Sequence, residues 1–431
     1  MKILKKPAIL GYLALFPLIF GTTNLHQVSA EELFDYGEIL TPIWEGDTCY
    51  QESVLVVEEQ DGSIAPISLL YPATEIISVK SATLETTYIK DTDYSLSNGK
   101  LVVNKDGSIP HLTYQRMHPT SIEELEYQTP VDVYESASGG YINLIEGMWY
   151  HERQIVVTYK HSETYQGYIP ESKGNLLPKT QEILKNHGEL NVFVFGDSIS
   201  TGSNSSGKYS TSPYMPIYPL LVKRGLEDTY GVTVNMVNES VGGKDSKWGM
   251  NTIGSLLPKY QGTHFDLAII AFGMNDGYSA KETASNEKAI MDKISEKDLN
   301  CEFVLVGTML PNPDCIRARQ HQGEQVEALL PYECNGCVVG NMTDVHRYLL
   351  SKKRFADMTG NDINHCNDYL ARVYAMTLLK TIHQDETPYV PKPHTKRNVG
   401  LIIGISVGGS AVVLGAGILI AYGIKKRKKP H

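Results

Sequence analysis

A serine follows an apolar run that has the composition of a buried strand. Residues 192–202 have the sequence VFVFGDSISTG, in which Ser198 stands directly after Gly196 and Asp197. The carboxyl end of a parallel strand is where open α/β sheets bind ligands, and a serine held there can serve as a nucleophile. Small polar residues also end ordinary strands, so this stretch needs support from the rest of the chain.

A histidine and an aspartate near the carboxyl end of the chain complement that serine. The segment GNDINHCND places Asp362 three residues before His365 and just before a helix expected over residues 367–382. His365 can accept the proton of Ser198 and return it to a leaving group. Asp362 can hold the imidazole tautomer and stabilise the imidazolium.

Two further segments supply donors for a developing oxyanion. NESVGG ends in Gly242 and Gly243, and AFGMNDG contains Asn275. The backbone N–H groups of Ser198 and Gly243, with the side-chain amide of Asn275, meet the requirement for hydrogen-bond donors that are already in place. Gly242 is an alternative donor to Gly243. Together these residues predict acyl transfer through a covalent intermediate.

The elements around these segments predict an α/β domain. Four continuous apolar runs alternate with helix-like segments, which is typical of a mostly parallel sheet covered on both faces. The expected strands are NVFVFG, VTVNMVN, FDLAIIAFG and CEFVLVGTM, and the expected helices cover residues 216–230, 247–260, 281–299 and 367–382. Residues 311–340 form an insertion that either walls the cleft or is peripheral.

The four segments in this order resemble the SGNH, or GDSL-type, hydrolase family. GDSIS is similar to its first block, NESVGG to its second, GMND to its third and DINH to its fifth. The resemblance covers about residues 190–382 and implies a three-layer α/β/α fold. It also implies that Ser198, Gly243, Asn275 and His365 are the name-giving residues, with Asp362 as the triad acid. Such a serine hydrolase needs no metal or organic cofactor.

Two more residues are candidates for substrate binding. Asp197 either tunes Ser198 or holds its turn, and Trp248 either stacks on a sugar face or covers the core. The loop TGSNSSGKYSTSPY after Ser198 either faces the substrate or is a plain surface loop.

Residues 31–173 contain short β-type runs separated by turn signals such as DGS and SNGK. They predict an all-β sandwich or jelly-roll-like module ahead of the hydrolase domain of residues 174–384. That order loosely resembles two-domain carbohydrate esterases. We therefore expect an enzyme that hydrolyses O-acyl, chiefly acetyl, esters on extracellular carbohydrate. A lipid or thioester hydrolase, an O-acyltransferase and a non-catalytic glycan-binding surface protein are the alternatives.

Both ends of the chain predict a surface protein. Residues 1–30 have a basic start, an apolar stretch and a small-residue cleavage site, as a signal peptide does. A Pro-rich tether over residues 385–398 precedes an uncharged run over residues 399–424, which predicts one transmembrane helix, and a basic tail follows over residues 425–431. The basic tail predicts a cytoplasmic end and an extracellular catalytic domain.

The charge of the chain narrows the classes of molecule that it can bind, and its cysteines leave several roles open. The formal net charge is −10, and basic residues gather at the two ends, so the middle of the chain is acidic and unsuited to nucleic acid. Six cysteines are present, two of them in the CxxC pair Cys334 and Cys337. Disulfides, unpaired thiols and a metal site remain open for them.

Overall fold

The computed structural model describes residues 34–126 and 133–386, which belong to one compact unit. At its centre is a five-stranded sheet with the strand order β12-β11-β10-β8-β9, in which every neighbouring pair is parallel. The strands are β8 (Glu189–Gly196), β9 (Thr233–Asn238), β10 (Leu267–Ala271), β11 (Glu302–Gly307) and β12 (Cys337–Asn341).

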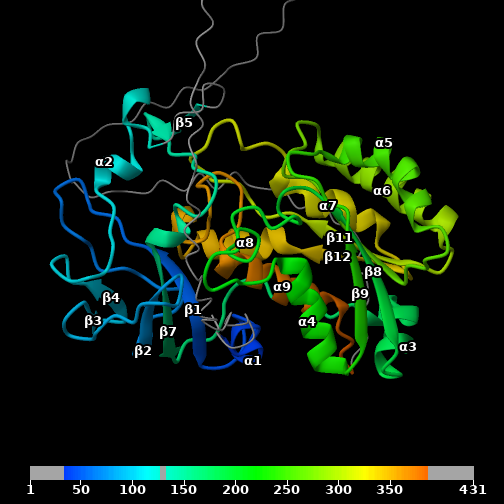
Figure 1. Ribbon diagram of the computed structural model, residues 1–431, viewed down its shortest axis with the longest axis horizontal. Helices are drawn as coiled ribbons and strands as arrows, with labels where there is room; N and C mark the ends of the chain where they lie inside the picture. The colour runs from blue at the N-terminus through cyan, green and yellow to red at the C-terminus, as the bar shows by residue number, and fades with distance from the viewer. Residues whose placement is uncertain (1–33, 127–132, 387–431) are drawn as a thin grey trace, which may run out of the picture. The chain divides into compact units, whose positions relative to one another are not determined.

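Helices cover both faces of this sheet (Figure 1). One face packs against α5 (Ser246–Leu256), α6 (Ala280–Lys297) and α7 (Gln325–Leu329). The other packs against α3 (Pro178–Lys185), α4 (Tyr218–Tyr230), α8 (Met342–Leu350) and α9 (Asp368–Ile382). The predicted three-layer α/β/α arrangement with a parallel sheet is therefore correct.

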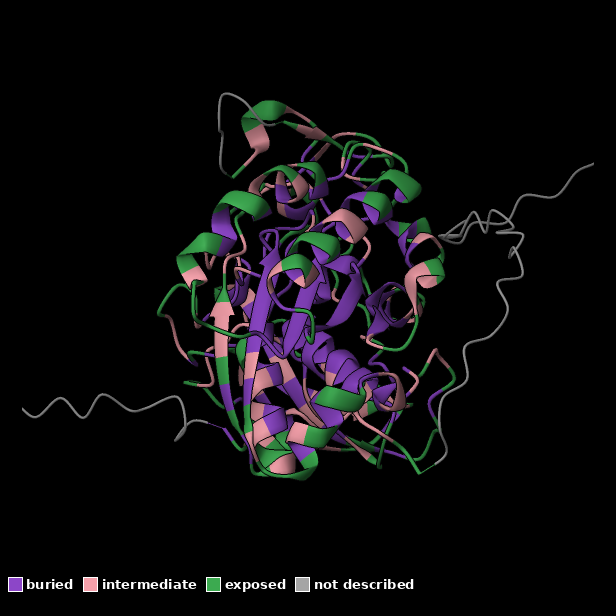
Figure 2. Cartoon of the chain, turned by 90° about the vertical axis from the view of Figure 1, so that its right-hand side faces the viewer, coloured by how far each residue is buried: buried purple, intermediate pink, exposed green. Residues whose placement is uncertain are grey.

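The alternation of side chains along β8 explains why the sheet needs a layer of helices on each face. Val192 and Val194 pack into one hydrophobic cluster, whereas Phe193 and Phe195 pack into the other. Successive side chains of a strand point to opposite faces, so a continuous apolar run is stable only between two layers. Figure 2 shows the central strands buried along most of their length.

The fifth strand was not expected from the sequence. α7 and most of β12 come from residues 311–340, for which the sequence predicts an insertion that either walls the cleft or is peripheral. The run CVVGN is short and follows two turn-forming residues, Asn335 and Gly336, so its apolar pattern is too brief to identify a strand.

The N-terminal part is built on a smaller antiparallel sheet of order β1-β7-β2. Its strands are β1 (Thr48–Leu55), β2 (Ala73–Ser81) and β7 (Gln154–His161). Two short ribbons accompany the sheet: β3 (Tyr94–Ser97) with β4 (Lys100–Val103), and β5 (Tyr134–Glu135) with β6 (Tyr141–Ile142). Short helices complete this part and the loops of the α/β part: α1 (Tyr36–Ile39), α2 (Tyr114–Met117), η2 (Ile122–Glu124), η3 (His151–Arg153), η4 (Gly174–Leu176), η5 (Leu257–Tyr260), η6 (Gln322–Glu324), η7 (Leu330–Tyr332) and η8 (Phe355–Asp357).

The predicted all-β sandwich or jelly-roll-like module is supported in part. Its described strands form one three-stranded antiparallel sheet and two two-stranded ribbons, with short helices among them. β1 also lies against the α/β part. Arg372 of α9 donates to the carbonyl oxygens of Tyr50 and Gln51, at 3.2 and 2.7 Å, and the Leu55 N–H donates to Asp357 of η8 at 2.9 Å.

One hydrophobic cluster has members on both sides of residue 173, the predicted domain boundary. It contains Val54 and Tyr159 of the small sheet together with Val194 and Tyr374 of the α/β part. The boundary itself stays a prediction.

The predicted fold class is also corrected with respect to its transmembrane helix. Within residues 34–126 and 133–386, none of the helices combines the length and the apolar character needed to cross a bilayer. The longest helix of this part, α6, has 18 residues and is rich in Lys and Glu. The predicted signal peptide, the apolar run over 399–424 and the basic tail lie outside the described residues, as does the tether beyond residue 386.

Candidate active site

Ser198 lies in a tight turn at the carboxyl end of β8. The Asp197 Oδ1 atom accepts a hydrogen bond from the Ile199 N–H at 2.9 Å, which closes the turn. Gly196 is required here, because a Cβ at this position would lie 2.3 Å from the Ala271 carbonyl oxygen. The turn thus holds Ser198 at the strand end, where its side chain is 4% exposed.

His365 reaches the same point from the segment before α9. Its Nε2 atom lies 2.9 Å from Ser198 Oγ. The His365 backbone is fixed at both of its polar groups, since its N–H donates to Asn361 Oδ1 and its carbonyl accepts from Gly360 and Thr359, all at 3.0 Å. The structure therefore brings the predicted nucleophile and the predicted base into hydrogen-bond contact.

Asp362 does not contact the imidazole of His365. Its Oδ1 atom accepts from Asn312 Nδ2 at 3.2 Å, and its own N–H donates to Thr359. The residue has a φ of +61°, in the left-handed region, and its carboxyl contacts Asn312. Burial raises the pKa of Asp362 well above its ordinary value, and the nearby Asp314 adds to that rise. The predicted Asp362–His365 pairing is thus not among the contacts of the site.

Three other side chains face the Nδ1 atom of His365. Asn204 Oδ1 lies 2.6 Å away, Asn361 Nδ2 3.0 Å and Glu146 Oε2 3.3 Å. Asn204 belongs to the loop after Ser198, for which the sequence leaves open whether it faces the substrate or is a plain surface loop. Glu146 comes from the segment between β6 and η3, and no motif in the sequence points to it.

Gly242 and Gly243 follow β9 and lie beside the serine turn. The Val241 N–H donates to the Gly196 carbonyl at 3.1 Å, which extends the pairing of β9 with β8 beyond the strand. A Cβ on Gly242 would stand 3.7 Å from Ser198 Cβ, and Gly243 has a φ of +71° that favours glycine. None of the described residues accepts a hydrogen bond from the backbone N–H of Ser198, Gly242 or Gly243.

Asn275 is joined to the same loop. Its Nδ2 atom donates to the carbonyl oxygen of Lys244 at 3.1 Å, one residue after Gly243. The neighbouring Asp276 accepts from the Ser246 backbone and hydroxyl and from Thr283. These bonds connect the loops after β9 and β10 and place the predicted oxyanion donors on neighbouring strand ends.

Of the two remaining candidates for substrate binding, Asp197 is buried and Trp248 is partly buried. Asp197 is 1% exposed and holds the turn. Burial, opposed by the bond from Ile199, raises the pKa of Asp197 to about 7. Trp248 packs against the second hydrophobic cluster, with its ring centroid 5.6 Å from that of Phe195.

The cysteines make no disulfides: all six are free, and five are buried. Among residues 34–126 and 133–386, no group of three or more His, Cys, Asp or Glu side chains is arranged to hold a metal ion.

A hollow of about 490 Å³ opens beside the serine turn. It is lined by Thr201, Gly207, Lys208, Tyr214, Pro216, Ile217, Leu220, Asn238 and Ser240. Asn238 also donates to the carbonyl oxygen of Ser200, at 2.8 Å, so this hollow borders the segment that carries Ser198.

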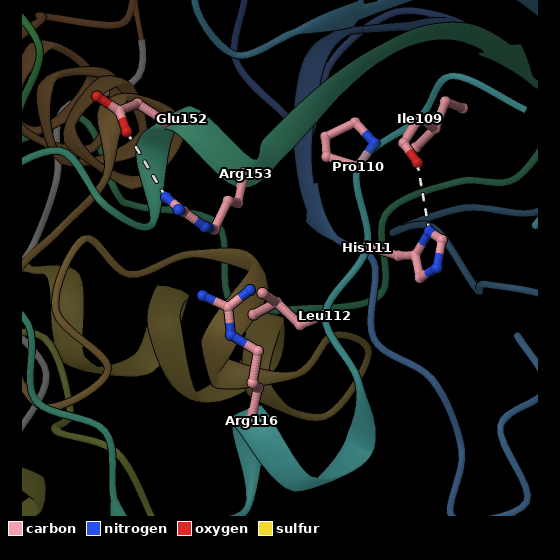
Figure 3. A pocket seen from close by; sticks show the side chains of 7 residues that line it. All are labelled: Ile109, Pro110, His111, Leu112, Arg116, Glu152 and Arg153. Atoms are coloured by element: carbon pink, nitrogen blue, oxygen red, sulfur yellow. Dashed lines mark hydrogen bonds and ion pairs between the residues drawn. The ribbon is translucent and has the colours of Figure 1, made fainter. Parts of the chain in front are cut away.

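Another hollow of about 500 Å³ lies in the N-terminal part (Figure 3). Its lining contains none of the residues that contact Ser198 or His365. It is formed by Ile109, Pro110, His111, Leu112, Arg116, Glu152 and Arg153.

A serine hydrogen-bonded to a histidine, at the carboxyl edge of a parallel sheet between two helix layers, is the arrangement of a serine hydrolase. The family model described as GDSL-like Lipase/Acylhydrolase matches residues 192–302. The chain therefore carries a domain of this family, and the predictions of a GDSL-type domain and of a serine ester hydrolase are confirmed.

Solved structures with related folds include three esterases. A two-domain esterase, CEX, active on acetylated mannans and co-crystallised with mannopentaose, is 20% identical with a TM-score of 0.40; the match covers 53% of this chain and 59% of that one. Axe2, an acetyl-xylooligosaccharide esterase from Geobacillus, is 14% identical (TM-score 0.37, 47% and 99% covered). EstA from Pseudoalteromonas sp. is 17% identical (TM-score 0.31, 44% and 96% covered). This chain thus spans about three fifths of the length of the first two-domain structure. No curated protein matches the sequence.

Proposed function

We propose that this protein is an esterase that removes O-acyl groups, acetyl foremost, from extracellular carbohydrate. The observation that carries the proposal is the 2.9 Å contact between Ser198 Oγ and His365 Nε2 at the sheet edge. This contact pairs a nucleophile with a base, and the glycine loop beside it leaves backbone donors free.

The first half of the reaction forms an acyl-enzyme. Ser198 Oγ attacks the carbonyl carbon of the ester while His365 Nε2 takes the hydroxyl proton. The backbone N–H groups of Ser198 and Gly243 and the Asn275 amide donate to the negative oxygen of the tetrahedral intermediate. His365 then gives its proton to the departing sugar oxygen, which leaves as a free hydroxyl.

The second half repeats these steps with water. His365 removes a proton from water, the hydroxide oxygen attacks the acyl carbon, and the same donors hold the second oxyanion. The proton returns to Ser198 Oγ as the carboxylic acid leaves. Every proton and electron pair is accounted for by these residues, the ester and one water molecule.

The residues that line the hollow beside the serine turn favour a carbohydrate as the alcohol part of the ester. Its lining residues include an aromatic residue, Tyr214, and the polar residues Lys208 and Asn238. Tyr214 is 41% exposed, and Tyr209 of the same loop is 43% exposed. Exposed tyrosine rings beside hydrogen-bonding groups suit a sugar, which has apolar faces and a rim of hydroxyl groups. Acetylated polysaccharide is also the substrate named for the CEX structure.

Action outside the cytoplasm is part of the proposal. The support is the sequence of residues 1–30, which has the order of a basic start, an apolar stretch and a small-residue cleavage site. Fractionation of cells that express the full chain, with an esterase assay on each fraction, tests this part separately.

The experiment is an acetate-release assay with the purified full-length chain on acetylated mannan and acetylated xylan. It is paired with aryl esters of two to twelve acyl carbons, and the Ser198→Ala variant is the control. We expect acetate release and highest turnover with the shortest acyl groups. A chain-length optimum at eight carbons or more indicates a lipid hydrolase, and acyl transfer to an added sugar in preference to water indicates a transferase. Glycan binding with no turnover indicates a binding protein.

A further inference from the structure

We propose that Glu146, from the N-terminal part of the chain, is the positioning carboxylate of His365 and acts there together with Asn204. This inference rests on the proposed function, because it assigns the group that orients the base of that reaction. It replaces Asp362, which the motif spacing predicted for the role.

The proton on Nδ1 is assigned by the orientation of Asn204. The Asn204 Nδ2 atom donates to the carbonyl oxygens of Gly147 and Gly360, at 2.9 and 3.2 Å. An amide whose nitrogen faces two acceptors has its oxygen fixed on the other side, so Oδ1 is the atom that meets His365. An oxygen acceptor 2.6 Å from Nδ1 requires that Nδ1 carry the proton. The Nε2 atom is then unprotonated and free to accept from Ser198.

Asn361 holds Glu146 from a second side but does not assign the tautomer, because its Nδ2 atom, 3.0 Å from Nδ1, is a donor and makes no hydrogen bond to a protonated Nδ1. Its Oδ1 atom accepts from the backbone N–H groups of Ile363, Asn364 and His365, each at 3.0 Å, which fixes the direction of the amide. Its Nδ2 atom donates to Glu146 Oε1 at 3.1 Å. One carboxylate oxygen of Glu146 thus meets Asn361, and the other lies 3.3 Å from the Nδ1 atom of His365.

The segment that carries Glu146 is held firmly on both sides. Ile145 is buried in a cluster with Leu55 and Tyr150, and the Tyr150 hydroxyl donates to the Asn143 carbonyl at 2.6 Å. Gly147 accepts from Asn204, as described above. The carboxylate is therefore presented by an anchored loop.

The carboxylate of Glu146 supplies a negative charge, which the neutral amide of Asn204 lacks. The amide orients the imidazole, but only a negative charge offsets the positive charge that His365 gains when it accepts the serine proton. Desolvation raises the pKa of Glu146, but the hydrogen bond and charge of His365, with help from Asn361 and Asn204, lower it to a net value below its ordinary one. The carboxyl of Glu146 is thus ionised at neutral pH.

Another titratable group near the imidazole is Asp197, whose pKa His365 lowers against the larger effect of burial. Ser198, Asn204 and Asn361 supply the other contacts of the ring and carry no charge. Asp362 makes none. Glu146 is therefore the acidic side chain that contacts the imidazole on the side away from the serine.

The test compares Glu146→Gln with the matched variant Glu152→Gln in the full-length chain. Glu152 lies six residues further on, is 58% exposed and makes only an ion pair with Arg153 at 3.6 Å. Both variants lose one negative charge and keep the side-chain shape. The readouts are the pH profile of kcat/KM for an acetyl ester and the rate at which a fluorophosphonate probe modifies Ser198.

For Glu146→Gln we expect both rates to fall about 10-fold at neutral pH and the acid limb of the profile to move to lower pH. The direction follows because loss of the carboxylate disfavours the imidazolium, so the base stays unprotonated at lower pH. The loss is smaller than the roughly 10⁴-fold effect at a buried triad aspartate, since Glu146 is half-exposed and shares Nδ1 with Asn204. Glu146→Asp should recover part of the rate, and Glu152→Gln should stay within about 2-fold of the wild type.

Two outcomes overturn the proposal. One is an unchanged acid limb and labelling rate in Glu146→Gln. The other is an acid-limb shift in Asp362→Asn that Glu146→Gln lacks. The probe separates this question from the substrate: a wild-type chain that is labelled at Ser198 yet releases no acetate from glycans contradicts the proposed function and still tests Glu146. A wild-type chain that is not labelled at Ser198 contradicts both.

Discussion

Lys353 and Glu52 form an ion pair in which both side chains are fully buried. Glu52 lies on β1 of the small sheet, and Lys353 lies between α8 and η8 of the α/β part. Glu52 also accepts from the Leu70 N–H at 2.9 Å and from the Tyr159 hydroxyl at 2.6 Å. Lys353 also donates to the Ser53 carbonyl at 3.0 Å. The two parts of the chain thus share a charged contact inside a common core.

The first prediction concerns the loss of one partner of this pair. Lys353→Met leaves the Glu52 carboxylate without its counter-charge in a site that excludes water. Breaking a buried pair in this way costs about 3–5 kcal/mol of unfolding free energy. Denaturant unfolding followed by tryptophan fluorescence measures the change.

The neighbouring Lys352 provides the control, because it is exposed and faces only the ring of Tyr348. Lys352→Met should change the unfolding free energy by less than about 0.5 kcal/mol. Adding Glu52→Gln to Lys353→Met should restore part of the loss. Equal stability of the two lysine variants would contradict a stabilising role for the buried pair.

The second prediction concerns the pair of Ser198 and His365. Ser198→Ala and His365→Ala should each lower ester hydrolysis by several orders of magnitude, and the double variant should lose little more. Groups that act as one unit give such non-additive losses. Steady-state rates on an acetyl ester, with unfolding midpoints to verify folding, measure this. Additive losses would mean that the two residues act separately.

The third prediction concerns Asn275. Asn275→Ala should lower kcat by about 10²–10³ with a smaller change in KM, as the loss of one oxyanion donor does. Its amide also bonds to Lys244, so the unfolding midpoint is recorded beside the kinetics. A rise in KM alone would make Asn275 a binding residue.

The residues at strand ends were predictable because their positions depend on local patterns. Apolar runs ended by Gly, Asp or Asn give both the strands and the loops that follow them, and the parallel order brings those loops together. Ser198 was predicted in this way, His365 from its place just before the last helix, and the four longest helices, α4, α5, α6 and α9, from apolar periodicity that lies within single segments. Asp245 and Asn367 cap α5 and α9 with their side chains.

The partners of the imidazole were not predictable, because they depend on how distant segments pack. Asp362 has the expected spacing from His365, but its carboxyl contacts Asn312 and not the imidazole. Glu146 is 219 residues before His365 in the numbering and reaches it only because the N-terminal part packs on the α/β part.

The last prediction concerns the buried carboxyl of Asp197. Burial is the largest influence on it and raises its pKa to about 7, from an ordinary value of 3.8. Its Oδ2 atom has no hydrogen-bond partner among the described residues. Because the folded state holds this proton more tightly than the unfolded chain, the stabilising contribution is present below pH 4 and is lost as the pH rises toward about 7. Three pKa units correspond to about 4 kcal/mol.

Asp197→Asn removes this titration and keeps an oxygen that can accept from the Ile199 N–H. We therefore expect the unfolding free energy of the variant, relative to the wild type, to rise by up to about 4 kcal/mol between pH 4 and pH 8. Denaturant unfolding at a series of pH values gives both curves, and the other buried carboxyls are common to the two proteins. Parallel curves across this range would show that Asp197 is ionised in the folded protein at acidic pH. The carboxyl would then have to be stabilised as an anion beside Ser198, in spite of its burial.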